Sequence, residues 1–263
     1  MKIIKLNPKT NGSRHQIKLE KSLLAKKNNL IKLFFFKKHR SQGRSTATGR
    51  ITVWHKGSSC KRRLREIKFS NEQNWSIVLF MYYDPMRSTF VSLNFDLNSF
   101  SFFNSLSTLN TYPGSLLINN QKQLELKLGY KSTLSFIPTG SLLHSISLSK
   151  NQSIKYVRSA GTFCQLVQKN QERCKIRLPS GVLFDVPLFS CGTLGTLSNT
   201  QSNQVVIGKA GRNRLKGIRP TVRGIAMNPV DHPHGGRSNG GRPSVTPWGL
   251  PTRGKPTSKK KYI

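Results

Sequence analysis

The residues of this chain that could do chemistry gather in one short stretch near the C-terminus. Residues 224–236 read GIAMNPVDHPHGG, which puts Asp231 beside His232 and places His234 two positions further on. An acid next to a histidine can act as a general-base pair, and two close histidines can bind a metal. Catalysis needs a rigid surrounding shell, and a structural zinc needs four ligands. The surrounding glycine- and proline-rich sequence supplies neither, so we predict no catalytic residue and no metal site.

A contact with RNA agrees better with the residue types around this motif. Glycines let backbone amides approach phosphates, prolines lower the entropy cost of ordering, and histidine can stack on bases or donate to 2′-hydroxyls. Trp248, in the tetrapeptide TPWG, can anchor or stack in the same way. Cations precede and follow the motif: Arg212, Arg214, Lys216, Arg219, Arg223, Arg237 and Arg242.

The net charge of the whole chain points to a polyanionic partner. The 263 residues carry 44 Lys+Arg against 9 Asp+Glu, a formal charge of +35. Such a charge repels itself in a compact monomer, whereas nucleic acid releases counterions when its phosphates are neutralised. Residues 1–68 hold 20 of the cations and residues 205–263 hold 13, so two basic arms flank a more ordinary middle. A membrane surface is not favoured, because no amphipathic basic helix or lipidation signal is evident.

Other classes of protein lack support in the sequence. Four scattered cysteines without a C-x-x-C pair predict neither a zinc ribbon nor a disulfide framework, and favour a reducing compartment. The longest apolar run, residues 77–83, is too short to cross a bilayer. The N-terminus lacks the pattern of a secretory signal.

The middle of the chain predicts β-structure. Residues 75–83 are nearly all apolar, as in a strand buried on both faces, and residues 84–87 (DPMR) form a turn signal. Residues 91–97 alternate apolar with polar side chains, the period of a half-buried strand. Because turn signals recur about every ten residues, we expect small barrels rather than a parallel sheet. Further strands are predicted at 51–54, 64–69, 142–148, 162–167, 174–178 and 182–189.

Two other features complete this interpretation. His144 lies on an apolar strand face, which favours a hydrogen-bonded core histidine over a ligand. The last 59 residues hold 10 of the 21 glycines and 7 of the 13 prolines, so this segment cannot bury enough apolar surface to fold alone.

The sequence contains a series of recognisable motifs, at residues 9–15, 49–52, 83–88, 158–162, 207–211, 217–224, 226–236 and 244–249. Together they resemble the universal large-subunit ribosomal protein L-two family of bacterial and organellar type. The resemblance implies a mostly β fold, in which an OB-like barrel is followed by an SH3-like barrel, with long extended basic arms at both ends. It divides the chain into a basic N-terminal arm (1–48), an OB-like RNA-binding barrel (49–135), an SH3-like barrel (136–200) and an extended Gly/Pro/basic tail (201–263).

The resemblance also implies a function and partners. We expect a structural, non-enzymatic protein that binds large-subunit ribosomal RNA near the peptidyl-transferase region, beside neighbouring ribosomal proteins and facing the small subunit. No cofactor is expected beyond RNA-associated Mg²⁺. The predicted RNA-binding residues are Arg44, Arg50, Lys56, Lys61, Arg62, Arg63, Arg87, Arg158, Lys209, Arg212, Arg214, Arg219, Arg223, His232, His234, Arg237, Arg242 and Trp248.

Departures from the family and alternatives remain. Residues 237–242 lack the family's acid, residues 57–61 lack its usual glycines and histidine, and residues 98–135 match poorly. Heavy use of Phe, Leu, Ser, Asn, Ile and Lys suggests an AT-rich organellar gene, and family-like sequence from residue 9 leaves no room for a transit peptide. We therefore expect a mitochondrial ribosome, with a plastid or bacterial one as the alternative. The other functional hypotheses are a free RNA chaperone and a metal-dependent hydrolase using the Asp-His-Pro-His segment.

Overall fold

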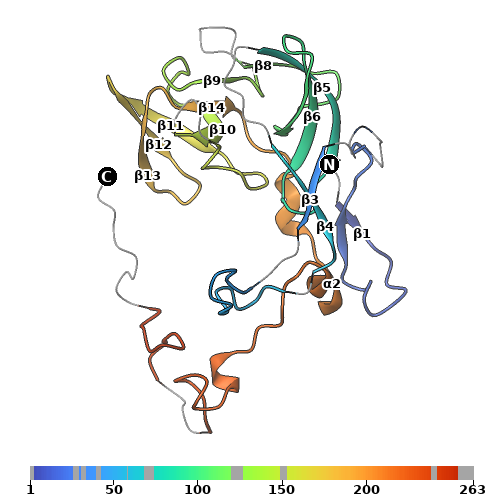
Figure 1. The fold of residues 1–263 in the computed structure, drawn as a ribbon, viewed down its shortest axis with the longest axis vertical. Helices are drawn as coiled ribbons and strands as arrows, with labels where there is room; N and C mark the ends of the chain where they lie inside the picture. Colours follow the sequence, from blue (N-terminus) through green and yellow to red (C-terminus); the bar gives the residue numbers. More distant parts are fainter. Residues whose placement is uncertain are drawn as a thin grey trace. The chain divides into compact units, whose positions relative to one another are not determined.

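The fold is taken from a computed structural model, which describes residues 3–25, 30, 34–39, 43–57, 59–67, 74–119, 127–148, 153–237 and 242–253. Contacts divide the chain into two compact units. The first contains residues 1–39 and 61–212, and the second contains residues 40–60 and 213–263. Figure 1 shows the course of the chain.

The first unit is built on a ten-stranded sheet. Its order is β13-β12-β11-β10-β14-β9-β8-β5-β6-β7, and every pairing is antiparallel except the short contact between β8 and β9. A mostly β fold is therefore confirmed, with β5–β8 preceding β9–β14 as expected for an OB-like and then an SH3-like half. The strands are β5 (Asn74–Tyr83), β6 (Phe90–Asp96), β7 (Phe102–Leu106), β8 (Leu116–Asn119), β9 (Lys131–Thr133), β10 (Leu142–Ser147), β11 (Cys164–Lys169), β12 (Arg173–Arg177), β13 (Leu183–Pro187) and β14 (Cys191–Leu194).

The predicted hairpin of β5 and β6 forms, but the predicted burial of its strands was wrong. Trp75 and Tyr83 of β5 are each 44% exposed, so this strand is not buried on both faces. On β6 the polar residues Ser92, Asn94 and Asp96 are all buried. The alternation is real, but neighbouring strands and loops cover the polar face as well as the apolar one. Polar side chains there bond to one another instead of to water.

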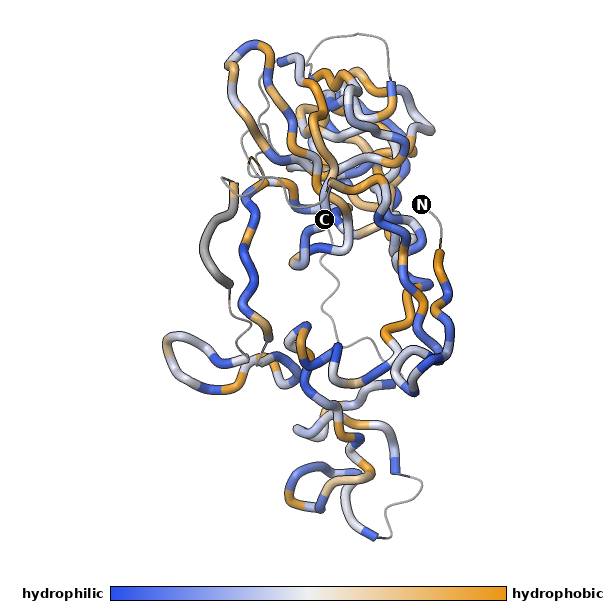
Figure 2. The backbone as a smooth tube through the Cα atoms, turned by 90° about the vertical axis from the view of Figure 1, so that its right-hand side faces the viewer, coloured by the Kyte–Doolittle hydropathy of each residue, from blue (hydrophilic) through white to orange (hydrophobic). Residues whose placement is uncertain are grey.

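The second half of the sheet encloses its own core. Leu143, Ile146, Leu166 and Ile176 are fully buried and pack with Val186 across β10–β13. Figure 2 colours the chain by hydropathy and shows hydrophobic segments gathered where its strands pack. The hairpin of β12 and β13 is in continuous register over five pairs, as the alternation of residues 174–178 predicted.

His144 is the hydrogen-bonded core histidine that the sequence predicted. The residue is 1% exposed, and its Nε2 and Nδ1 lie 3.0 Å from Thr108 Oγ1 and 2.9 Å from Ser145 Oγ. Burial lowers the pKa of the imidazole to about 3. The ring is therefore neutral and joins the loop at Thr108 to strand β10.

The turn predicted at residues 84–87 is confirmed and is braced by charge. Asp84 Oδ1 accepts a hydrogen bond from the Met86 amide at 2.9 Å. The fully buried carboxylate also forms ion pairs with Arg65 at 3.1 Å and Arg87 at 3.3 Å. The turn thus ties β5 to β4 (Arg62–Arg65), which pairs with β3 (Phe35–His39).

The described N-terminal residues of the first unit contain a hairpin. Strands β1 (Ile3–Lys5) and β2 (Ile17–Leu19) pair antiparallel, and Ile17 forms a further bridge with Val206. Arg212 donates to the carbonyl oxygens of Gly12 and Ile207, which holds the hairpin to the segment around residue 208. The family-like motif at residues 9–15 is the turn of this hairpin.

The second unit consists of turns and short bridges. The strand predicted at residues 51–54 was wrong, because the amides of Thr52 and Val53 both bond to the Gly43 carbonyl and bend the chain.

The strand predicted at 64–69 is realised only as β4; residues 68–69 lie outside the described part. Short helices that the sequence did not predict are η1 (Thr200–Gln204), α2 (Ala210–Leu215) and η2 (Gly224–Ala226).

All four cysteines are free thiols; Cys60 is exposed and the other three are buried. Burial raises the pKa of Cys164 to about 12 and that of Cys174 to about 11. Among the described residues, no helix has the length and apolar character needed to span a membrane.

Candidate nucleic-acid interface

The Asp-His-Pro-His segment folds into a closed loop of its own backbone. The amides of Asp231 and His232 bond to the Asn228 carbonyl at 3.0 and 3.3 Å. The Gly236 amide then bonds to the Met227 carbonyl at 3.3 Å and closes the loop. Residues 227–236, which we call the histidine loop, are therefore a defined shape and not an irregular connection.

The two histidines hold this loop together from inside. His232 is 8% exposed, and its Nδ1 accepts the His234 amide at 3.0 Å. The ring centroids of the two histidines are 4.6 Å apart. His234 Nε2 lies 3.1 Å from both the Val245 amide and the Pro243 carbonyl. One imidazole nitrogen cannot accept from the amide and donate to the carbonyl at the same time. We assign Nε2 as the acceptor of the hydrogen bond from the Val245 amide.

Two glycines make room for this arrangement. A Cβ on Gly235 would lie 2.3 Å from the Asn228 carbonyl oxygen, and a Cβ on Gly224 would lie 2.7 Å from the His232 ring. Real side chains do not come so close, so both positions need glycine. Gly236, with φ of +97°, adopts a backbone conformation that other residues rarely take.

In this geometry the histidines bond to the backbone of the segment itself. His232 directs Nδ1 to a backbone amide, while Asp231 is exposed on the outside of the loop. The residues that the structure describes contain no group of three or more His, Cys, Asp or Glu side chains placed to share a metal. The histidines therefore act on the loop's shape, which the residue types alone did not predict.

A second hairpin follows the histidine loop and carries Trp248. The Thr246 amide bonds to the Leu250 carbonyl at 2.7 Å, and the Gly249 amide bonds back to the Thr246 carbonyl at 2.9 Å. Pro247 and Trp248 occupy the two central positions of this tight turn. The Trp248 side chain is 69% exposed.

The segment of residues 43–57 pairs with the start of the tail. Lys56 forms a bridge with Ile218, the Gly57 amide bonds to the Gly217 carbonyl at 3.0 Å, and the Arg219 amide bonds to the His55 carbonyl at 3.0 Å. Residues that the resemblance assigned to the OB-like barrel thus share one unit with residues assigned to the tail. The sequence gave no sign of this pairing.

The predicted RNA-binding residues are divided between the two units. Most are exposed, as contact with phosphate requires, but Arg62, Arg87, Arg212, Arg214 and His234 are half-buried and His232 is buried. The first unit holds Lys61, Arg62, Arg63, Arg87, Arg158, Lys209 and Arg212. The second holds Arg44, Arg50, Lys56, Arg214, Arg219, Arg223, His232, His234, Arg237, Arg242 and Trp248.

Some of these cations also have partners within the protein. Arg87 pairs with Asp84, and burial lowers the pKa of its guanidinium. Arg62 donates to the Pro85 carbonyl at 3.4 Å, Arg44 to the Gly49 carbonyl at 3.0 Å, and Arg242 to the Pro233 carbonyl at 3.4 Å. Such contacts fix the direction in which each guanidinium projects.

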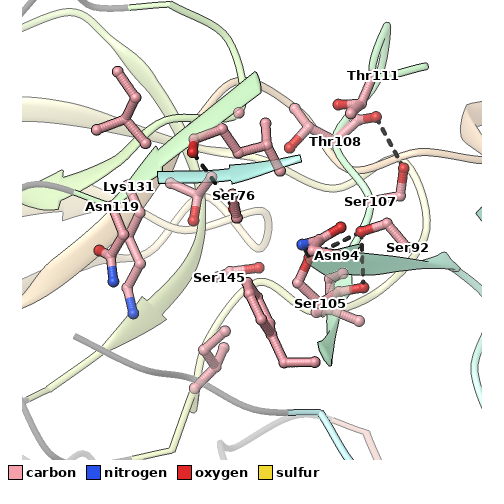
Figure 3. A pocket seen from close by; sticks show the side chains of 17 residues that line it. Ser76, Ser92, Asn94, Ser105, Ser107, Thr108, Thr111, Asn119, Lys131 and Ser145 are labelled. Carbon is pink, nitrogen blue, oxygen red and sulfur yellow. Dashed lines mark hydrogen bonds between the residues drawn. The ribbon is translucent and has the colours of Figure 1, made fainter. Parts of the chain in front are cut away.

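A pocket lined by both polar and apolar side chains lies within the first unit (Figure 3). It measures about 80 Å³, which is room for several water molecules. Ser92 and Asn94 both bond to Ser105 Oγ, at 2.9 and 2.8 Å. Ser92, Asn94 and Ser105 all line it, so the polar face of β6 meets other polar groups there.

Comparison with known proteins agrees with this architecture. Residues 127–249 match the model for "Ribosomal Proteins L2, C-terminal domain", and residues 31–104 match "Ribosomal Proteins L2, RNA binding N-terminal domain". The chain belongs to the ribosomal protein L2 family.

Its relatives in the L2 family match along nearly the whole chain. "Large ribosomal subunit protein uL2m" of Reclinomonas americana is 42% identical over 98% of this chain and 94% of its own length. "Large ribosomal subunit protein uL2" of Rickettsia felis is 39% identical over 99% and 96%, and that of Orientia tsutsugamushi is 38% identical over 97% and 94%. These proteins are named as ribosomal constituents and not as enzymes.

The predicted RNA-binding residues did not include Trp54, which the structure places beside Trp248. Trp54 is 57% exposed, and its ring centroid lies 6.2 Å from that of Trp248. An aromatic residue inside a basic segment, two positions before Lys56, was a usable signal for stacking on nucleic acid.

Proposed function

We propose that this protein is a structural constituent of the large ribosomal subunit that binds large-subunit RNA, largely through its second unit. Family membership supports this role, and one observation carries the assignment to the second unit. Among the described residues of that unit, ten are Lys or Arg and one, Asp231, is acidic. Apart from Arg214 on α2, these cations lie outside helices and extended strands.

The chemistry of this unit suits phosphate better than other anionic partners. Arginine forks match phosphate oxygens, and glycine-rich turns allow backbone amides to approach the RNA chain. The histidine loop supplies a fixed surface at low entropic cost, because its own hydrogen bonds already order it. The remaining predicted residues of the first unit would add positioning contacts.

Finer assignments belong to the same proposal. The identity to the mitochondrial protein of Reclinomonas americana and the composition of the chain support a mitochondrial ribosome, with a bacterial or plastid ribosome as the alternative. We place the protein near the peptidyl-transferase region and the small-subunit interface, as the family resemblance implies. The RNA would bring its own Mg²⁺, and the histidines would act through packing rather than proton transfer.

Sedimentation tests the ribosomal role. A lysate of the source cells is run through a sucrose gradient at high salt, and fractions are probed for this chain. We expect it to remain in stoichiometric amount with the large subunit. Release to the top of the gradient would instead support a free RNA chaperone and refute the proposal.

The salt dependence of RNA binding tests the assignment to the second unit. Replacing Arg219 and Arg223 by Gln removes two exposed cations. If each contacts a phosphate, the slope of log K against log salt should shrink by about 1.4–1.8 in total. The matched control is Lys175→Gln with Arg177→Gln, an equal charge change on exposed positions of β12. Equal effects of the two double variants would contradict the assignment.

A further inference from the structure

The two exposed tryptophans of the second unit form a pair that the RNA-phosphate contacts do not explain. Trp54 and Trp248 are separated by almost 200 residues in sequence, yet their ring centroids lie 6.2 Å apart with an interplanar angle of 56°. They remain 57% and 69% exposed. Because tilted rings do not cover each other's faces, each keeps aromatic surface available to a ligand.

Both rings are held at the tips of ordered turns. Trp248 sits in the turn closed by the Gly249–Thr246 hydrogen bond, and the Ser244 and Thr252 hydroxyls at 2.6 Å brace the base of its hairpin. Trp54 follows Val53, whose amide bonds to the Gly43 carbonyl at 3.1 Å. A rigid backbone presents each ring in advance, so little conformational entropy is lost when a ligand stacks on it.

The charge around the pair selects the kind of ligand. Arg50 and Lys56 flank Trp54 in sequence, and Arg242 and Arg253 flank Trp248; all four are exposed. A protein partner would have to be strongly acidic, whereas a nucleotide brings an aromatic base and a phosphate together. Base stacking on aromatic side chains beside cations is the usual way in which proteins hold unpaired nucleotides.

We infer that Trp54 and Trp248 form a stacking platform for an unpaired base of the large-subunit RNA. This inference rests on the proposed function and adds the class of RNA element that the second unit recognises. A base in a duplex is already stacked on both sides, so the platform selects a single-stranded or bulged nucleotide. Stacking releases no counterion, so its contribution does not depend on salt in the way that the arginine contacts do.

Fluorescence and binding of the full-length chain test the platform. In a Trp75→Phe background the emission comes only from this pair, since the chain has three tryptophans. We expect a large-subunit RNA transcript to quench that emission. Trp54→Leu or Trp248→Leu should weaken binding by about 5- to 150-fold with an unchanged salt slope, the range for loss of one stacked base. Phe at either position should recover part of the loss.

Controls separate this inference from the proposed function. Leu250→Ala removes an exposed apolar side chain from the same hairpin and should leave affinity unchanged. If the parent binds RNA with steep salt dependence but the Leu variants bind equally well, the platform is refuted and the RNA-binding role stands. The platform would also be refuted if the transcript left the emission unchanged and the tryptophans were shielded only in the assembled subunit, since a protein neighbour would then cover them. If the parent fails to bind the transcript at all, the proposed function itself fails.

Discussion

Replacing Gly235 by Ala should open the histidine loop. The added Cβ would lie 2.3 Å from the Asn228 carbonyl oxygen, against 3.4 Å for ordinary contact, so about 1.1 Å of separation must be found. The obstacles are backbone atoms of Asn228 and Met227, which cannot rotate away as a side chain could. The loop backbone itself has to move.

The cost follows from the hydrogen bonds that converge on this point. The Asn228 carbonyl accepts from Asp231 and His232, and the Gly235 amide donates to the His232 carbonyl at 2.8 Å. Losing two or three such bonds at about 1 kcal/mol each predicts about 2–3 kcal/mol of local destabilisation. Because the loop belongs to a unit of turns, we expect this loss locally and not in the sheet.

Hydrogen exchange measured residue by residue checks this prediction. Amides of Asp231, His232 and Gly236 should exchange about 30- to 150-fold faster in the variant, while amides of the ten-stranded sheet should not change. Gly211→Ala is the matched control, because a Cβ there meets nothing within 4 Å and its φ is not positive. Unchanged protection in the Gly235 variant would show that the loop's shape does not depend on this close approach.

Two further predictions concern the first unit. Because the folded-state pKa of His144 is about 3 and its ordinary value is 6.5, the unfolded chain takes up this proton first as pH falls, so stability is lost from about pH 6.5 downward. If the imidazole has its ordinary pKa in the unfolded chain, urea denaturation should show that the free energy of unfolding falls by about 2 kcal/mol by pH 5. The variant His144→Asn should lack that part of the pH dependence. Asp84→Asn should cost about 3–5 kcal/mol at neutral pH, because Arg65 and Arg87 would face a neutral amide in a buried site. A urea-unfolding difference below about 1 kcal/mol would contradict this account of the turn.

Local signals in the sequence predicted the hairpins of β5 with β6 and of β12 with β13, because each depends on neighbours in the chain. The turn at residues 84–87 contains its own brace, since Asp84 bonds to the Met86 amide two positions away. The hairpin of β12 and β13 needs only alternation and a short connection. Period and turn chemistry are properties of a few consecutive residues, and the sequence shows them directly.

Burial on β6 could not be predicted in the same way. Alternation shows that Ser92 and Asn94 share a face, but not what covers that face. In the folded chain Ser105 of β7 bonds to both, and the cavity between the strands gives the polar face room. Whether a polar face meets water or other polar groups is decided by segments distant in sequence.

The ordered structure of the second unit could not be predicted from the sequence for a related reason. Its order comes from contacts between residues 43–57 and residues 213–253, which are far apart in the chain and have no periodic pattern. A composition rich in glycine and proline suggested a segment unable to fold alone, and none of the residues described in this unit belongs to a buried hydrophobic cluster. Backbone hydrogen bonds between the two segments, together with closely packed glycines, provide the order instead.

This origin of order explains why the Asp-His-Pro-His motif resembles an active site without being built as one. A segment with no hydrophobic core must satisfy its own backbone groups, and histidine offers a compact ring with a donor and an acceptor. His232 and His234 use their acceptor nitrogens on the amides of His234 and Val245, which closes one loop and joins it to the next hairpin. Asp231 is left outside, where it is the single acid among the cations described in this unit. The same residues that would suit a catalytic pair therefore shape a surface whose charge suits RNA, and the platform of Trp54 and Trp248 lies within that unit.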